Sequence, residues 1–173
     1  MPTVDFVAAV DAYIAARKQI VGVTTPQMWR EGRAIGEGEL VVKFPIEVNG
    51  EQHSSHTLII SAFPDADELK FSITLVYQWA VCRLDYEIGR RHSNVNKPIG
   101  SNIPNFIIGP HYHPWRENRT KISDMHTAFK LPWAVPLGAH IRQFDSALRW
   151  FCHENNIELR EHAIELPQKE RLI

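Results

Sequence analysis

The sequence predicts an α+β protein in which an antiparallel β-meander carries two helices on one face and a long Pro/Gly-rich loop at one end. Three observations predict this fold. Apolar residues alternate strictly from 39 to 48, three further strand-like segments follow with turns between them, and a helical pattern lies near each end of the chain. With 173 residues, 44% hydrophobic and 23% charged, we expect one domain spanning residues 1–173.

The first element is predicted to be a helix. Its apolar residues recur at spacings of three and four: Phe6, Val7, Val10, Tyr13 and Ile14. Thr25-Pro26 is typical of an N-cap followed by proline at the first helical position, which predicts a short second helix through about Arg33.

The middle of the chain is predicted to be four strands in sequence. In the first, over 39–48, Pro45 lacks an amide hydrogen, which indicates an edge strand. Asn49-Gly50 is a hairpin turn signal, and the following strands are expected over 56–63, 70–77 and 79–88. Such a succession is typical of an antiparallel meander with one packed face.

The pattern breaks after Ile88. Residues 89–136 hold six prolines and three glycines, and only 105–108 has the character of a strand. Long irregular segments in small domains are usually functional, so we expect the site here. A helix over about 137–153 and a strand over 157–166 are predicted to complete the chain.

Composition limits the function classes. The net charge of −1 excludes a globally basic nucleic-acid-binding protein, whereas nine histidines are an excess to be explained. The chain contains no run of 18 apolar residues, so no membrane span is predicted, and the N-terminus does not resemble a secretory signal. Cys82 and Cys152 stand in apolar surroundings, as expected of buried reduced thiols. We therefore expect a cytoplasmic protein with no membrane partner.

A group of chemically capable side chains surrounds the predicted loop. Alternation over 79–88 places Arg83 and Asp85 together on the face opposite the apolar residues. His92 follows shortly afterwards, and His111 and His113 share a face if the chain there is extended. Residues 83–121 hold seven basic and three acidic residues, a local charge of +4 that favours a polyanion such as RNA.

Two chemistries fit these residues. In the first, two histidines cleave RNA as general acid and base, Arg83 or Arg116 stabilises the charged intermediate, and no cofactor is needed because the 2′-hydroxyl is the nucleophile. The predicted catalytic residues are His111, His113, Arg83, Asp85 and His92, and the predicted substrate-binding residues are Arg90, Arg91, Asn94, Trp115, Arg116 and Arg119. In the second, His111 and His113 bind a divalent metal with Asp85 or His92.

The run Arg83-Leu84-Asp85, His92-Ser93-Asn94 and Pro110-His111-Tyr112-His113 resembles an uncharacterised bacterial and phage family with the pattern Arg-x-Asp, His-x-Asn, Pro-His-x-His. More distantly it resembles the TumE-like toxins of toxin–antitoxin pairs, although this chain has a long insert between His92 and His111 and an extra N-terminal helix. The resemblance implies a toxin-like ribonuclease in a toxin–antitoxin or phage-defence setting.

A different class of function stays open. The chain is also compatible with a non-enzymatic interaction protein, such as an inhibitor of a host system or the partner of an antitoxin. In that case the loop over 89–136 is the contact surface, and Trp115 and Trp133 are its anchors.

Overall fold

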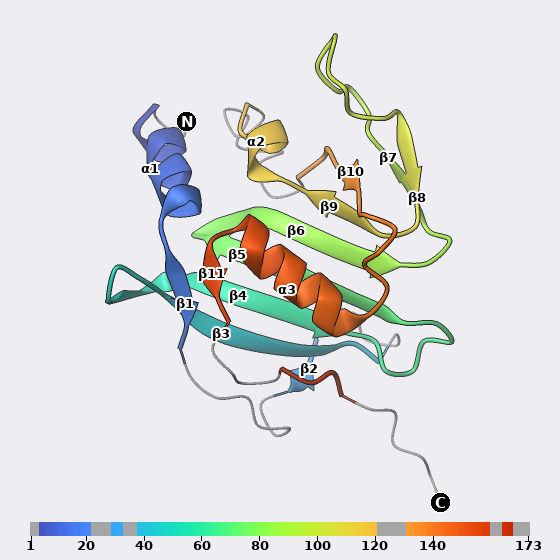
Figure 1. Cartoon of the computed structure of the whole chain (residues 1–173), viewed down its shortest axis with the longest axis horizontal. Coiled ribbons are helices and arrows are strands. Elements are labelled where there is room, and N and C mark those ends of the chain that lie inside the picture. The colour runs from blue at the N-terminus through green and yellow to red at the C-terminus, as the bar shows by residue number, and fades with distance from the viewer. Residues whose placement is uncertain (1–3, 22–28, 33–37, 121–130, 160–163, 168–173) are drawn as a thin grey trace, which may run out of the picture.

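The computed structural model describes residues 4–21, 29–32, 38–120, 131–159 and 164–167. Its centre is a meander of four antiparallel strands that lie side by side in chain order (Figure 1). They are β3 (Leu40–Val48), β4 (Glu51–Ala62), β5 (Lys70–Tyr77) and β6 (Trp79–Glu87). The predicted α+β fold with a β-meander is therefore confirmed.

The alternation of side chains decides which face of this meander is packed. Val42, Phe44, Leu58, Ile60 and Ile73 are all fully buried on one face. The residues between them point to the other face, which we call the open face. The turn between β3 and β4 uses Asn49 and Gly50, both with positive φ, as the Asn-Gly signal predicts.

The predicted helices near the two ends of the chain cover the packed face. Tyr13 of α1 (Val4–Ala15) contacts His56 and Tyr77, while Phe144 of α3 (Phe144–Glu154) packs edge-on against Phe71. The last helix was predicted to begin near residue 137, which is wrong. It begins at Phe144 because the amide of Gln143 is satisfied by the Ser146 hydroxyl, which fixes the N-terminus there.

The prediction that Pro45 marks an edge strand is wrong. Two short strands pair with the outer side of β3, β1 (Lys18–Ile20) along 46–48 and β2 (Arg30–Glu31) along 40–41. Pro45 lies between these two pairings, beside a register shift, so its missing amide hydrogen removes no ladder bond. The edge beyond β1 is β11 (Ile157–Glu158), in parallel.

Two other predicted elements differ from the structure. Most of the predicted helix from Thr25 to Arg33 lies outside the described residues, and in the described part Arg30 and Glu31 form β2 instead. The predicted last strand is confirmed only at Ile157–Glu158. Residues 160–163 lie outside the described residues, and 164–167 have no regular structure.

The segment over 89–136 is more ordered than predicted. It contains β7 (Arg91–Ser93) and β8 (Phe106–Ile108), which pair as a separate hairpin that projects from the main sheet (Figure 1). It also contains β9 (His111–His113), the short helix α2 (Trp115–Asn118) and β10 (Val135–Pro136). β9 adds to the free edge of β6, and β10 adds to β9. Within the described residues, no helix is both long and apolar enough to cross a membrane.

Candidate functional site

The edge of the main sheet brings four of the five predicted catalytic residues together. β6 and β9 pair antiparallel, with Arg83 directly opposite His113 and Asp85 directly opposite His111. All four side chains point to the open face, because Leu84 and Tyr112, which alternate with them, are buried on the packed face. The predicted sharing of a face by His111 and His113 is thus confirmed.

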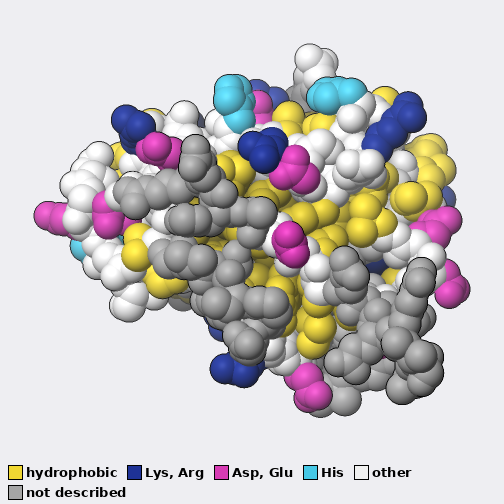
Figure 2. All heavy atoms as spheres, turned by 60° about the horizontal axis from the view of Figure 1, so that its bottom comes forward, with side chains coloured by type: hydrophobic (Ala, Val, Ile, Leu, Met, Phe, Trp, Pro, Cys, Tyr) yellow, Lys and Arg dark blue, Asp and Glu magenta, His cyan; other side chains and the backbone are white. Residues whose placement is uncertain are grey.

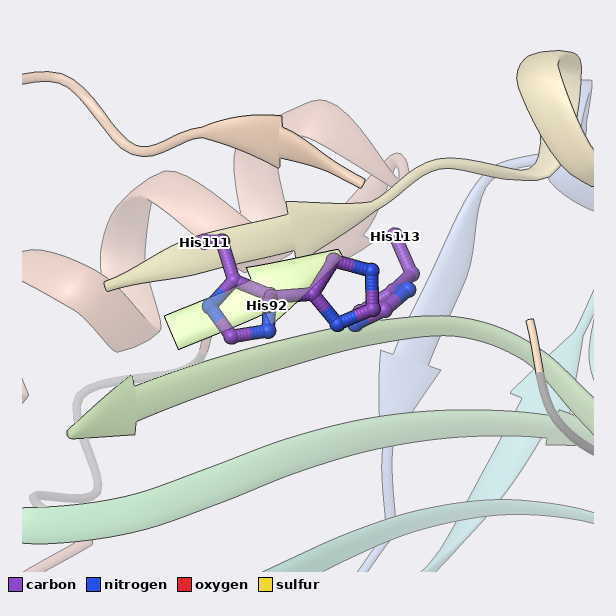
Figure 3. A group of neighbouring side chains, drawn as sticks. All are labelled: His92, His111 and His113. Atoms are coloured by element: carbon purple, nitrogen blue, oxygen red, sulfur yellow. The ribbon is translucent and has the colours of Figure 1, made fainter. Parts of the chain in front are cut away.

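The fifth residue, His92, comes from the projecting hairpin. Its ring stacks on His111 with centroids 4.7 Å apart and meets His113 edge-on at 4.8 Å, while His111 and His113 are 5.1 Å apart (Figure 3). One nitrogen from each of the three rings can act as a metal ligand, and these three nitrogens lie within 4.8 Å of one another. His111 and His113 are buried, with 2% and 0% of their surface exposed. We call these three residues the histidine cluster.

Backbone carbonyls orient two of the three rings. Nδ1 of His111 lies 2.9 Å from the carbonyl oxygen of Gly109, and Nε2 of His92 lies 3.1 Å from that of Pro132. A carbonyl oxygen only accepts, so each of these nitrogens carries a proton and donates it. In the neutral form of each ring the lone pair is then on Nε2 of His111 or on Nδ1 of His92, where a ligand can bind.

His113 has two neighbours with opposite demands. Its Nε2 lies 3.3 Å from Oδ2 of Asp85, which can only accept, and 3.2 Å from Nη2 of Arg83, which can only donate. A single nitrogen satisfies one of them at a time. Nδ1 of the same ring is buried and has no hydrogen-bond partner among the described residues. Such an orphaned buried atom is costly unless a further ligand rearranges the site.

The charges of the site are fixed by burial and by the Arg83–Asp85 ion pair. Burial disfavours ionisation of Asp85, but the hydrogen bond from His113 and the charge of Arg83, whose Nε is 2.8 Å away, outweigh it and hold the pKa of Asp85 at about 2. Burial lowers the pKa of His113 to about 4, and it also lowers the pKa of His111. Near neutral pH the site therefore holds one carboxylate, one guanidinium and two uncharged buried imidazoles.

This protonation state favours metal binding over proton donation. A neutral imidazole is a metal ligand or a base, whereas a general acid must carry a proton at the working pH. His113 with a pKa of about 4 carries no such proton near pH 7. Three imidazoles with a carboxylate beside them are instead a donor set typical of zinc and related transition metals.

The predicted substrate-binding residues lie around the site in different roles. Asn94 and Trp115 are buried and serve packing: the Asn94 amide bonds the backbone at Pro104 and Ala134, and the Trp115 indole donates to Asp11. Trp115 and Trp133 have 4% and 2% of their surface exposed, so neither side chain is accessible to a partner.

The arginines predicted to bind substrate have acidic or aromatic partners. Arg90 pairs with Glu87, Arg116 with Glu117, Arg119 with Asp11, and Arg91 lies over the ring of Phe106. On the described surface in Figure 2, Lys and Arg side chains are scattered, several of them beside an Asp or Glu, and form no continuous basic patch. Glu87 and Glu117 are already counted in the local charge of +4, so among these pairs only the one with Asp11 lowers it, to +3.

Sequence reasoning missed the groups that hold the cluster in place, and it assigned Asn94 to substrate binding instead. The carbonyls of Gly109 and Pro132 carry no side-chain signal, and the bonds of Asn94 to Ala134 join segments forty residues apart. Asn118 has a similar role, since its amide bonds the backbone of Pro114 and Trp133. The signal available in the sequence was weak, because Asn94 and Asn118 are two of five asparagines in the segment 89–136, where a proline-rich backbone needs side-chain partners.

The chain matches no protein-family model, and neither the curated proteins nor the solved structures contain a match to it. The resemblance to the Pro-His-x-His family and to TumE-like toxins therefore stays a prediction. The class of site is defined here by its geometry alone: a buried three-histidine cluster with an adjoining carboxylate and guanidinium.

Proposed function

We propose that this protein binds a divalent transition-metal ion through His92, His111 and His113 and uses it to hydrolyse a phosphodiester. The observation that carries this proposal is the convergence of three imidazoles whose ligand nitrogens lie within 4.8 Å of one another. Two of these rings are already oriented by carbonyl groups, as metal-ligating histidines usually are.

The donor set also suits the chemistry. Three imidazole nitrogens leave a coordination position that a water molecule or the substrate can take, which is the arrangement of catalytic zinc sites. Asp85 is close enough to act as a further ligand or as a base, with Oδ2 3.5 Å from Nε2 of His111 and 3.3 Å from Nε2 of His113. A bound metal supplies an acidic water at neutral pH, which removes the need for a protonated histidine.

RNA is the substrate that the sequence favours, and cleavage of RNA in a toxin–antitoxin or phage-defence setting stays part of the proposal. The metal-free version, with His111 and His113 as acid and base, is weaker. Burial lowers the pKa of both rings, and this leaves the reaction without a general acid near neutral pH.

A binding function without catalysis is the second candidate, and one observation favours it. Among the described residues, five of the six exposed large hydrophobic side chains fall between 88 and 108. They are Ile88, Val95, Ile99, Phe106 and Ile108, and most belong to the projecting hairpin. Exposed apolar groups gathered in this way are typical of protein interfaces. These five exposed residues, rather than the buried Trp115 and Trp133, are the candidate anchors for a partner.

One experiment separates the two candidates. Wild-type protein, His113→Ala and Ile99→Lys are loaded with zinc or manganese and incubated with a labelled RNA of mixed sequence. The hydrolase proposal predicts metal-dependent cleavage that His113→Ala abolishes and Ile99→Lys leaves intact. No cleavage by the metal-loaded wild type with any of several RNA and DNA substrates would contradict it, and circular dichroism verifies that both variants are folded.

A further inference from the structure

The open face continues from the histidine cluster across β6, β5 and β4 as two rows of paired residues. In one row, Ser61 pairs with Ser72, and Ser72 pairs with Asp85. In the next row, Ile59 pairs with Thr74, and Thr74 pairs with Arg83. Directly paired side chains on one face lie about 5 Å apart, so Ser72 and Thr74 adjoin the charged pair.

The hydroxyl groups of these rows are available. Ser61, Ser72 and Thr74 are only half-buried, and among the described residues none of their hydroxyls takes part in a hydrogen bond. Arg83 uses Nε towards Asp85 and Nη2 towards His113, which leaves Nη1 without a partner in the same part of the structure. About a third of the Arg83 side chain is exposed. Unused donors are therefore concentrated beside the histidine cluster.

These donors suit a phosphate group. A guanidinium nitrogen and two hydroxyls supply separate donors to a tetrahedral oxyanion, which has more acceptor oxygens than a carboxylate. Asp85 is the one negatively charged residue in the two rows, because Ser61, Ser72 and Thr74 are uncharged. Its carboxylate is therefore the one group of these rows that repels an anion. Lys43, which pairs with Ile59, adds a cation at the far end of the row of Arg83.

We infer that Arg83, Ser72 and Thr74 form a phosphate-binding platform on the open face, next to the histidine cluster. The inference rests on the proposed function and names the part of the substrate that the sheet holds. A cation at the cluster attracts the Asp85 carboxylate and weakens its hold on Arg83. The platform therefore binds phosphate more tightly in the metal-loaded protein than in the metal-free one.

The test measures binding of two probes by calorimetry, to protein loaded with zinc and to protein treated with a chelator. The probes are inorganic phosphate and the DNA dinucleotide dTpdT, whose phosphodiester has no neighbouring 2′-hydroxyl. The variant is Thr74→Val, which removes one hydroxyl at nearly constant volume. The matched control is Thr57→Val, on the same face but outside both rows, where Thr57 pairs with Pro45 and Val76.

The platform predicts that Thr74→Val weakens binding of at least one probe about tenfold, the usual effect of losing a hydrogen bond to a charged group, while Thr57→Val binds as the wild type does. Tighter binding of dTpdT identifies a nucleic acid backbone as the source of the phosphate, and binding of inorganic phosphate alone identifies a small phosphate compound. Equal affinities in the two variants, or no binding of either probe, would overturn the inference.

Zinc content, measured on every sample, distinguishes this failure from that of the proposed function. If the protein binds zinc stoichiometrically but binds neither probe, the metal centre is supported and the phosphate-binding platform is contradicted. A protein that takes up neither zinc nor manganese, iron, cobalt, nickel or copper contradicts the proposed function itself, whatever the probes do.

Discussion

The imidazole of His92 stacks on the imidazole of His111, with ring centroids 4.7 Å apart, although the two residues belong to different sheets. His92 lies on the β7–β8 hairpin and His111 on the edge of the main sheet. The histidine cluster therefore exists only while the hairpin is docked. Asn94 joins the hairpin to the main body by accepting from the amide of Ala134 and donating to its carbonyl oxygen.

Asn94→Ala tests this dependence without touching a proposed ligand. Losing three side-chain hydrogen bonds, two of them buried, is expected to lower the free energy of unfolding by about 2–4 kcal/mol. It is also expected to weaken zinc binding at least tenfold because His92 loses its position. Urea unfolding and a zinc titration measure the two effects. Asn102→Ala, at an exposed position of the same hairpin, is the control and should change neither quantity. Undiminished zinc affinity in Asn94→Ala would show that docking does not depend on this residue.

Arg83→Met is expected to increase metal affinity. The guanidinium lies 3.2 Å from Nε2 of His113 and holds Asp85 at 2.8 Å, so it competes with a cation for both groups. Removing this charge should tighten zinc binding about tenfold, at the cost of any activity that needs Arg83. Arg90→Met removes an exposed arginine paired with Glu87 and is the matched control. If Arg83→Met binds zinc more weakly than Arg90→Met does, Arg83 supports the metal rather than opposing it.

The sequence was sufficient for the meander because its signals are local. Alternation over 39–48, the Asn49-Gly50 turn and the pairing of neighbouring strands need no distant information. The sharing of one face by Arg83 and Asp85, and by His111 and His113, follows from the same period of two. That these pairs face each other across β6 and β9 depends on a long-range register that alternation does not specify.

The remaining errors have the same physical origin. The sequence predicts an edge position for Pro45 because β1 and β2, which flank it, are short and carry almost no pattern of their own. The sequence predicts a surface loop for Trp115 and Trp133 because the many prolines and glycines give no sign of burial that arises from contacts with α1 and the hairpin. The number of basic residues could not reveal that Arg119 pairs with Asp11, more than a hundred residues earlier.

Acid is expected to destabilise the metal-free protein through His113. Burial lowers its pKa from 6.5 to about 4 in the folded state, so between these values the unfolded chain binds a proton that the folded chain does not. Stability is therefore complete above pH 6.5 and is lost as the pH falls towards 4, by about 2–3 kcal/mol for this group. His111 also lowers stability as the pH falls, because burial lowers its pKa as well. Asp85 adds a further loss of stability as the pH falls from 3.8 to about 2.

Urea unfolding of chelator-treated protein at several values between pH 4.5 and 7.5 measures this dependence. His113→Gln should show a smaller slope over the interval, and His153→Gln, an exposed histidine of α3, should keep that of the wild type. An unchanged slope in His113→Gln would mean that His113 titrates as it does in the unfolded chain.

Lys18 is expected to be essential for stability. Its buried ammonium donates to the carbonyl oxygens of Tyr13, Ile14 and Ala16 and so satisfies the C-terminal end of α1. Burial lowers its pKa to about 8, which still leaves it protonated at neutral pH. Lys18→Met should cost about 2–4 kcal/mol. The exposed ion pair of Arg17 with Glu158 provides the comparison, since Arg17→Met should cost less than about 1 kcal/mol. Thermal unfolding measures the loss of stability in each variant. Equal losses in Lys18→Met and Arg17→Met would contradict the prediction.

The most direct measurement is the stoichiometry and affinity of zinc in purified protein, by elemental analysis and by titration against a chromogenic chelator. The proposal predicts one zinc per chain in the wild type and at least a hundredfold weaker binding in each of His92→Ala, His111→Ala and His113→Ala. His53→Ala, an exposed histidine away from the cluster, should bind as the wild type does. A wild-type protein that takes up no zinc, manganese, iron, cobalt, nickel or copper at neutral pH, or three single variants that bind as the wild type does, would contradict a metal centre at the histidine cluster.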